Sequence, residues 1–282
     1  MMNVAFLGTG FLGSGMAEGM LARGNTVTVW NRTEAKARAL EALGAKVAPS
    51  PEEAVVAADY VHMALPDDGV VDAIVARFAP RLRPGAVVID HSTTSPAGAK
   101  KRLARAEKQG IRFIHAPVFM TPQMCRESKG LMLVSGPAAI FEQARAELAK
   151  MTGEVWYLGE RPDLAASYKL FGNSMLFVIT AGVADVFAMA NGVGVTPADA
   201  ISLFSKFQVA GAIPARAAKM SRGASFELTM ARKDMLLMIE AAGGQPLAVL
   251  PAIAKRMDDA IAKGHGRDDL GAIAAEVVTS AR

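Results

Sequence analysis

The glycine spacing near the start of the sequence constrains this chain more than any other feature. Gly8, Gly10 and Gly13 form the pattern G-x-G-x-x-G, which follows a short apolar run at 4–7 and precedes the β-branched run TVTVW at 26–30. Apolar residues between the two runs recur near helical spacing, so the segment predicts a strand, a turn, a helix and a second strand. In this context the pattern predicts a dinucleotide-binding turn, and the alternative is that the glycines serve only close packing.

Each glycine has a physical role in the dinucleotide hypothesis. Gly8 permits the tight turn, Gly10 lets the backbone approach a pyrophosphate, and Gly13 lets the helix pack close to the strand. The unsatisfied amide groups at the start of the helix then face the anion. We expect the cofactor to contact the turn and the first helical residues, namely Gly8, Thr9, Gly10, Phe11, Leu12 and Gly13.

The first half of the chain continues this alternation of strands and helices. Strands that alternate with helices require parallel pairing through right-handed crossovers. The fold class is therefore expected to be α/β, with residues 1–162 forming a doubly wound sheet that has helices on both faces and binds ligands beyond the carboxyl ends of its strands. Further strands are predicted at 59–65, 86–90, 111–115, 131–135 and 154–158, and helices at about 34–43, 69–78, 97–109 and 138–150.

The second half of the chain is predicted to be all α. Strand signals stop after about residue 162, and a long, largely apolar helical stretch runs from 163 to 191. At 282 residues the chain is long for a single core, so residues 163–282 are expected to form a second, all-helical domain. Its later helices are predicted at about 197–207, 211–221, 229–242, 247–263 and 268–280.

The composition excludes several classes of function. The 31 basic and 27 acidic residues are scattered, and no basic block is dense enough to predict a nucleic-acid partner. No uncharged run reaches the roughly 20 residues of a membrane span. A single cysteine, Cys125, allows no intrachain disulfide, and the four histidines show no metal-ligand spacing. We expect a soluble, cytoplasmic protein that binds small anionic molecules and no metal.

The residues after the second strand bear on the choice of dinucleotide. Sites that prefer NAD usually place an acidic residue there, about 20 residues past the glycines, to bind the ribose hydroxyls. This chain has Asn31, Arg32 and Thr33 instead. A guanidinium pairs with a 2′-phosphate and stacks on adenine, so NADP is predicted over NAD. The alternative is that Arg32 is a solvated residue and Thr33 a plain helix N-cap.

Several motifs in a fixed order resemble the β-hydroxyacid dehydrogenase family, which includes 3-hydroxyisobutyrate dehydrogenases and glyoxylate/succinic semialdehyde reductases. The resemblance covers nearly the whole chain. It is carried by FLGTGFLGSGMAEGML and WNRT in the first βαβ unit, ALPDD at 64–68, IDHSTTSP at 89–96, APV at 116–118, KLFGN at 169–173 and ARKDM at 231–235.

The resemblance implies a Rossmann domain, a long helix leading into an all-α domain, and a site in the cleft between them. It also implies that Lys169 is the catalytic lysine, Asn173 its partner, and Lys233 a residue near the nicotinamide. The i, i+4 spacing independently places Lys169 and Asn173 on one face of an otherwise apolar helix. The alternative is that Lys169 extends its amine to water and Asn173 binds a neighbouring loop.

Polar and apolar residues at the ends of two strands are further candidates. Ser92 and Thr93 lie just past a strand, so Thr93 is predicted to bind the cofactor and Ser92 the substrate. An N-cap role before the helix near Pro96 is the alternative for both. Leu65 and Pro66 also end a strand and are expected to form an apolar wall under the adenosine or ribose.

The segment after APV departs from the family pattern. Family members usually carry a serine and two glycines there, which hold the substrate carboxylate, whereas this chain has Phe119, Met120 and Thr121, which we take as candidate substrate-binding residues. One interpretation keeps a carboxylate-bearing substrate, held by Ser92, Thr121, backbone amides or the α domain in a more apolar pocket. Another notes a similarity to imine reductases, which generally lack the lysine at position 169. Simple core filling by the two bulky residues is the third.

Together these features predict an NADP-preferring oxidoreductase, with NAD as the other candidate cofactor. Its substrate is expected to be a small carbonyl or hydroxy compound of the β-hydroxyacid or semialdehyde type, with Lys169 as general acid and base. An imine reductase and a non-catalytic cofactor-binding interaction module are the alternatives. The resemblance and the apolar α domain favour a homodimer or homotetramer.

Overall fold

The computed structural model describes residues 2–192, 194–206, 226–241, 247 and 249–275. Contacts between residues divide the chain into two compact units, Met1–Lys169 and Leu170–Arg282. The division falls inside a long helix that begins at Leu164, a few residues after the expected boundary at 162. Lys169 is thus the last residue of the N-terminal unit.

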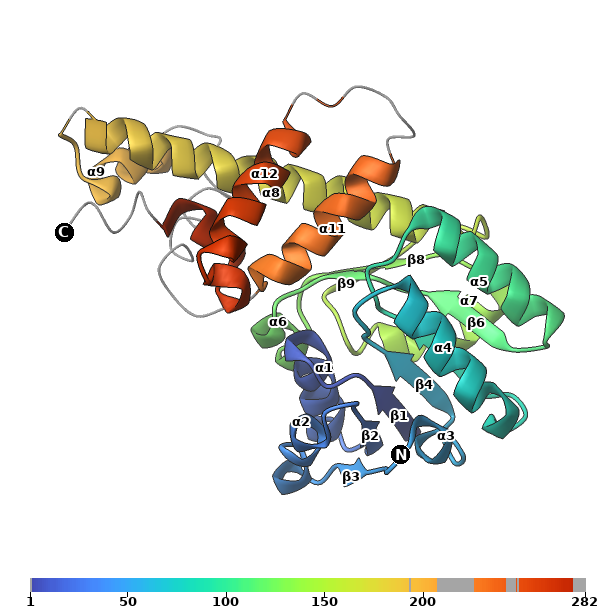
Figure 1. The fold of residues 1–282 in the computed structure, drawn as a ribbon. Coiled ribbons are helices and arrows are strands. Elements are labelled where there is room, and N and C mark those ends of the chain that lie inside the picture. The colour runs from blue at the N-terminus through green and yellow to red at the C-terminus, as the bar shows by residue number, and fades with distance from the viewer. Residues whose placement is uncertain (1, 193, 207–225, 242–246, 248, 276–282) are drawn as a thin grey trace. The chain divides into compact units, whose positions relative to one another are not determined.

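The N-terminal unit is built on a six-stranded parallel sheet with the strand order β3-β2-β1-β4-β5-β6 (Figure 1). The order reverses between β1 and β4, and such a reversal opens a crevice at the carboxyl ends of the strands. The predicted doubly wound fold is therefore confirmed. The strands are β1 (Asn3–Leu7), β2 (Thr26–Trp30), β3 (Lys46–Val47), β4 (Tyr60–Met63), β5 (Val87–Asp90) and β6 (Arg112–His115).

Helices cover both faces of this sheet because the strands are apolar on both sides. Along β1, Val4 and Phe6 pack into one core with α1 and α7, and Ala5 and Leu7 pack into another with α3, α4 and α5. Burial on both faces is what parallel strands require. The helices are α1 (Phe11–Ala22), α2 (Glu34–Arg38), α3 (Pro51–Ala54), α4 (Asp68–Phe78), α5 (Pro96–Lys108), α6 (Pro122–Arg126) and α7 (Ala138–Leu148).

The last strands of the unit do not join the parallel sheet, so the prediction of a single sheet was wrong for 131–135 and 154–158. They form a second sheet, β7 (Val118–Phe119), β8 (Leu131–Val134) and β9 (Glu154–Tyr157). Only two residues separate β6 from β7, too few for the crossover that parallel pairing needs. β7 pairs antiparallel with β8, which follows it after residues 120–130, and α7 lets β8 and β9 run parallel.

All described elements of the C-terminal unit are helical. They are the later part of α8 (Leu164–Gly192), α9 (Pro197–Ser202), α11 (Leu228–Ala241) and α12 (Leu250–Ala262), with short 3-10 helices at Leu203–Ser205, His265–Arg267 and Leu270–Ala274. A separate core forms around Phe177, Met235 and Met257. The helix expected at 211–221 lies outside the described residues, and the one expected at 268–280 is a short 3-10 helix, Leu270–Ala274, in its described part.

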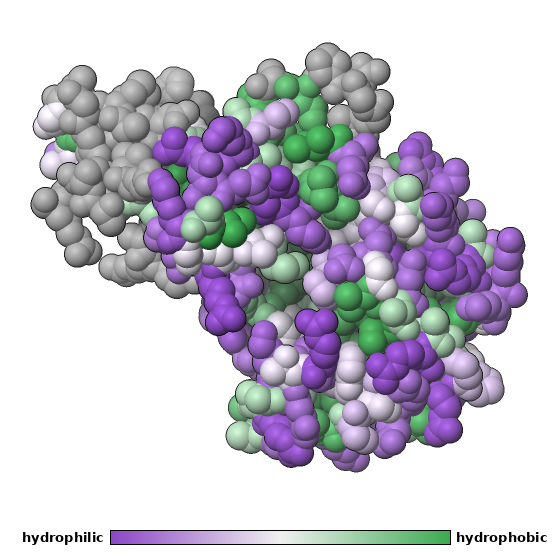
Figure 2. Space-filling model, viewed as in Figure 1, coloured by the Kyte–Doolittle hydropathy of each residue, from purple (hydrophilic) through white to green (hydrophobic). Residues whose placement is uncertain are grey.

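The surface and the long helix both bear on solubility. Polar side chains spread over the visible face of the N-terminal unit, with apolar groups small and separate (Figure 2). Within α8, the stretch Leu164–Val183 has a mean hydropathy of 1.2 and is long enough to cross a membrane by length and composition alone. Of this stretch 33% is buried inside the chain, and it carries the charged residue Lys169.

Two buried histidines, His62 and His91, stack their rings on Phe6 of β1. His91 Nδ1–H donates to the carbonyl of Ala116 (2.7 Å), so His91 Nε2 accepts, and His62 Nδ1–H donates to it (2.9 Å). A carbonyl only accepts, which fixes both tautomers. Burial lowers the pKa of His91 to about 4 and, together with His91, holds the pKa of His62 well below its usual range. Both rings are therefore neutral in the folded protein.

We expect this pair to make the protein sensitive to mild acid. Below about pH 6.5 these histidines are protonated in the unfolded chain but stay neutral in the folded chain. Their neutral contacts therefore contribute fully to the free energy of unfolding above that pH, and the free energy of unfolding falls as the pH drops below it. The contribution of His91 alone should lower the free energy of unfolding by about 2 kcal/mol at pH 5. Urea unfolding at pH 7.5 and pH 5 measures the decrease in the free energy of unfolding between the two pH values. His91→Gln should make this decrease smaller. His265→Gln, which lies outside the buried pair, should leave it unchanged. Equal stability at both pH values would contradict the neutral pair.

Candidate functional site

The three positions of the turn are glycine for different structural reasons. Gly8 has a φ of +96°, and a Cβ on it would clash with the carbonyl oxygen of Ala64, while a Cβ on Gly13 would clash with the carbonyl oxygen of Gly8. Close packing therefore explains these two. A Cβ on Gly10, by contrast, would meet no atom within 4 Å. Packing gives no reason for a glycine there, whereas an open approach to the backbone does.

The start of α1 fits an anionic ligand. Gly10 is the N-cap of the helix and supplies no side-chain hydrogen bond to its amides. Phe11 is exposed and Leu12 half-buried at the first turn. Thr9 is buried, and its hydroxyl has no hydrogen-bond partner in the described part of the chain. The open backbone and the uncapped amides are the features that a pyrophosphate would satisfy.

Asn31 joins the glycine turn to the end of β2. Its side-chain oxygen accepts the amide of Thr9 (3.0 Å), and its side-chain nitrogen donates to the carbonyl of Thr33 (2.9 Å). Asn31 thus fixes the position of the backbone on either side of Arg32. Arg32 and Thr33 are exposed, and Thr33 makes no side-chain cap bond to α2, although it occupies the N-cap position.

Ser92 ties the ends of β4 and β5 together. Its hydroxyl oxygen accepts the amide of Leu65 (2.9 Å), and its own amide donates to Asp90 (2.9 Å). The N-cap of α5 is Ser95, whose hydroxyl accepts the amide of Gly98, so neither Ser92 nor Thr93 has that role. Thr93 is half-buried in the same loop, and Leu65 and Pro66 are half-buried at the end of β4.

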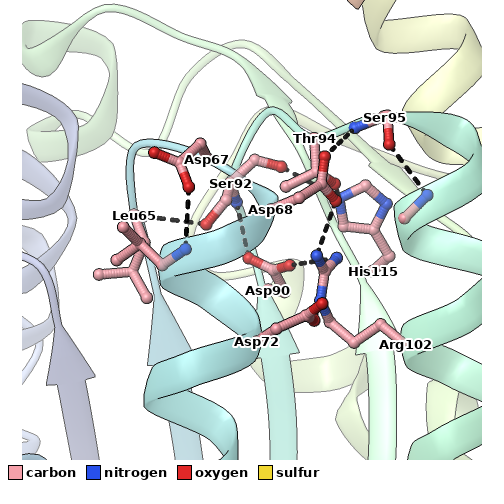
Figure 3. A network of polar contacts seen from close by, with 12 residues as sticks. Leu65, Asp67, Asp68, Asp72, Asp90, Ser92, Thr94, Ser95, Arg102 and His115 are labelled. Atoms are coloured by element: carbon pink, nitrogen blue, oxygen red, sulfur yellow. Dashed lines mark hydrogen bonds and ion pairs between the residues drawn. The ribbon is translucent and has the colours of Figure 1, made fainter.

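A buried arginine organises this edge of the sheet (Figure 3). The Arg102 side chain is 2% exposed and contacts Asp68 (2.7 Å), Asp72 (2.8 Å) and Asp90 (3.5 Å). Burial disfavours the guanidinium charge, but the carboxylates outweigh it, Asp90 most of all, and raise the pKa of Arg102. One cation thereby connects α4, β5 and α5.

The remaining carboxylate oxygens fix the loop between β5 and α5. Asp68 accepts the amide of Ser95 (2.8 Å), and Asp90 accepts that of Ser92. His115 Nε2–H donates to the carbonyl of Ser92 (3.0 Å) from β6. The loop that carries Ser92 and Thr93 is thus held at both ends. Sequence reasoning missed this network, although Asp68 and Asp72 have the i, i+4 spacing that places two carboxylates on one helix face.

The segment after APV divides its bulky residues between two environments. Met120 packs against the core that contains α1 and Cys125. Phe119 lies instead against Lys169, whose Nζ is 4.2 Å from the centre of the ring. The hydroxyl of Thr121 accepts the amide of Met124 (3.2 Å) and caps α6. Core filling therefore accounts for Met120, and a cation–π contact for Phe119.

Asn173 and Lys233 converge on a residue that sequence reasoning missed. Asn173 donates from its side-chain nitrogen to Asp234 (3.0 Å), and Lys233 lies 2.6 Å from the other oxygen of the same carboxylate. Asp234 is buried, so the two contacts compensate its charge. Asp234 belongs to the ARKDM motif, next to Lys233, and its burial is not visible in the sequence.

The described residues offer neither an activated thiol nor a metal site. Burial raises the pKa of the Cys125 thiol to about 12, so it is not an activated nucleophile. Among the residues that the structure describes, no three His, Cys, Asp or Glu side chains are placed to hold a metal ion.

Residues 3–159 match the family model for the NAD-binding domain of 6-phosphogluconate dehydrogenase. The 2-(hydroxymethyl)glutarate dehydrogenase of Eubacterium barkeri is 24% identical over 96% of this chain and 93% of its own length. The solved 3-hydroxyisobutyrate dehydrogenase of Mycobacterium tuberculosis with L-serine is 26% identical, with a TM-score of 0.83 over 98% of this chain and 99% of that one.

An imine reductase from Myxococcus stipitatus in complex with NADP+ shares the fold. It is 23% identical, with a TM-score of 0.70 over 97% of this chain and 99% of that one. At this identity the likeness concerns the fold alone.

The fold, the glycine turn and these matches define an NAD(P)-binding oxidoreductase. The chain belongs to the β-hydroxyacid dehydrogenase family, with an NAD-binding domain of the 6-phosphogluconate dehydrogenase type. It is accordingly a dehydrogenase or reductase.

We expect Arg102→Met to destabilise the N-terminal unit strongly. The substitution leaves Asp90 buried without its cation, and breaking a buried pair costs about 3–5 kcal/mol. Arg161→Met is the matched control, since its exposed pair with Asp163 should cost no more than about 1 kcal/mol. Urea unfolding of both variants measures the difference. Equal losses would contradict a structural role for the buried cluster.

Proposed function

We propose that this protein is an NADP(H)-preferring oxidoreductase that interconverts a small carbonyl compound and its alcohol, with Lys169 as general acid and base. The observation that carries the proposal is the position of the Lys169 amine. It lies at the end of the unit that contains the glycine turn, and against the segment after APV, through Phe119. The two dehydrogenase relatives support a carbonyl or hydroxy substrate by their names.

When bound, the cofactor supplies a hydride from its nicotinamide to the carbonyl carbon. The C=O π bond then breaks, and its electron pair remains on oxygen. The Lys169 ammonium donates a proton to that oxygen and is restored by a proton from water. In the oxidative direction the neutral amine accepts the hydroxyl proton instead. The chain itself orients the substrate and supplies the proton and the positive charge at the oxygen, because the hydride comes from the cofactor.

The other predicted residues have supporting roles in this proposal. The Ser92 hydroxyl already accepts the Leu65 amide and keeps its hydrogen to donate to substrate. Thr93 would bind the carboxamide, and Lys233 would lie near the nicotinamide, held by Asp234. Asn173 would position Lys169 or the substrate. Leu65 and Pro66 would lie under the adenosine or ribose.

Carbonyl reduction accounts for Lys169 better than imine reduction does. A protonated imine accepts hydride to give a neutral amine, so it needs no proton from the enzyme, and its charge is repelled by an ammonium. A developing alkoxide needs both the charge and the proton. We further propose a cytoplasmic homodimer or homotetramer, which the family resemblance and the apolar α domain support.

We expect Lys169→Ala to lower kcat by on the order of a hundredfold or more, the usual scale for a general acid. The affinity for NADPH should change little, because the amine acts on the substrate. Steady-state kinetics with a panel of small aldehydes and 2-oxo acids, and fluorescence titration of NADPH, measure the two effects. Lys255→Ala, an exposed lysine paired with Asp259, serves as control. Unchanged turnover in Lys169→Ala would remove this residue from the mechanism.

We expect Arg32→Ala to weaken NADPH binding at least about tenfold more than NADH binding, since a guanidinium–phosphate pair exists only with NADPH. Titration of each coenzyme against the variant measures the ratio. Arg38→Ala removes an exposed arginine of the same segment, which pairs with Glu34 and Glu41, and should spare the preference. An equal loss for both coenzymes would mean that the 2′-phosphate is bound elsewhere.

A further inference from the structure

The loop between β5 and α5 lies at the carboxyl ends of the parallel strands, one strand away from the point where the strand order reverses. Doubly wound sheets bind their ligands in this region. Two residues of the loop, Ser92 and Thr93, have roles in the proposed function, toward the substrate and toward the carboxamide of the cofactor. The contacts that hold the loop therefore bear on how the nicotinamide half of the cofactor binds.

The upstream end of this loop is held at Ser92 by the sheet. The Ser92 amide donates to Asp90 (2.9 Å), and its carbonyl accepts His115 Nε2–H (3.0 Å). Its hydroxyl oxygen accepts the amide of Leu65 (2.9 Å). Asp90 and His115 are the last residues of β5 and β6 and are fully buried. The position of Ser92 is thus fixed by neighbouring strands.

The downstream end is held by Asp68, the first residue of α4 (Figure 3). One oxygen of its carboxylate accepts the amide of Ser95 (2.8 Å), and the other contacts Arg102 (2.7 Å). Gly98 of α5 leaves room for this arrangement, because a Cβ at that position would clash with the Asp68 carboxylate. A carboxylate from α4 is therefore seated at the start of α5, where the helix dipole favours a negative charge.

Asp72 offers a matched comparison with Asp68. Both carboxylates pair with Arg102, at 2.7 Å for Asp68 and 2.8 Å for Asp72, and their side chains are similarly exposed, at 27% and 32%. In the part of the chain that the structure describes, Asp72 contacts Arg102 and Arg105 and makes no hydrogen bond to the loop. A function specific to Asp68 can therefore be separated from its share in compensating the charge of Arg102.

We infer that Asp68 is a positioning residue for the nicotinamide half of the cofactor, because it holds the downstream end of the loop that carries Ser92 and Thr93. A loop that is already ordered loses less conformational entropy when a ligand binds. The adenosine half is assigned to the glycine turn and Arg32, which belong to other elements, so Asp68 should not affect it. This inference rests on the proposed function, since it concerns the contacts assigned there to Ser92 and Thr93.

Two ligands that differ only in the nicotinamide ring test the inference. They are NADPH and 2′-phospho-ADP-ribose, which lacks the ring, and their Kd values are measured by isothermal titration calorimetry with the full chain. Asp68→Ala should raise the Kd of NADPH about tenfold, the scale of one hydrogen bond to a charged group, and change that of 2′-phospho-ADP-ribose less than about twofold. If the wild-type protein binds NADH more tightly, NADH and ADP-ribose form the pair.

Three further variants make the result specific. Asp72→Ala removes the matched carboxylate and should leave both Kd values unchanged. Asp68→Asn keeps an oxygen that accepts the Ser95 amide, so it should restore most of the NADPH affinity although the charge is lost. Gly98→Ala drives the Asp68 carboxylate away from α5 and should reproduce the selective loss. It keeps the inference open to test if Asp68→Ala does not fold, as judged by thermal melting.

The outcomes separate this inference from the proposed function. The inference is overturned, while the proposed oxidoreductase stands, if Asp68→Ala and Gly98→Ala weaken both ligands equally or weaken neither. The same holds if Asp72→Ala gives the selective loss, or if Asp68→Asn is as impaired as Asp68→Ala, since the effect would then come from the charge around Arg102. If the wild-type chain binds neither NADPH nor NADH, the proposed function fails and the inference with it.

Discussion

The buried contact of Arg102 with Asp68, Asp72 and Asp90 is the constraint on which the candidate site depends. A guanidinium that is 2% exposed is expensive to bury, and it is kept charged by carboxylates from two neighbouring elements. The oxygens that Arg102 leaves unused accept the amides of Ser92 and Ser95. The loop between β5 and α5 is therefore held in one conformation before any ligand arrives, which lowers the entropic cost of binding.

The residues of the glycine turn also have different structural roles. Gly8 and Gly13 are required by packing, Gly10 leaves the backbone open, and Asn31 uses its amide to join the turn to the segment that carries Arg32. Residues predicted to touch the cofactor thus fall into two groups. Some shape the cradle from within the protein, as Asn31 does, and others, such as the exposed Arg32, remain directed to solvent and are available to a ligand.

Lys169 is the proposed general acid and base, and the fold fixes the residues around its amine. Its neighbour is an aromatic ring, held by a strand and backed by a glycine that admits the bulk of Met120. The departure from the family pattern is thus an ordered part of the fold. Asp234, which binds both Asn173 and Lys233, plays a comparable role in the C-terminal unit by fixing two predicted residues through one buried charge.

The sequence alone determined the βαβ beginning, the doubly wound sheet and the helical second half, because apolar periodicity and glycine spacing are local signals. It could not place 131–135 and 154–158 in a second sheet, since that depends on the pairing of β8 with β7, a strand of two residues that is too short to give a pattern of its own. Only the tertiary structure assembled the Arg102 cluster and separated Phe119 from Met120. Those contacts join residues distant in the chain, and no local pattern specifies which side chains meet.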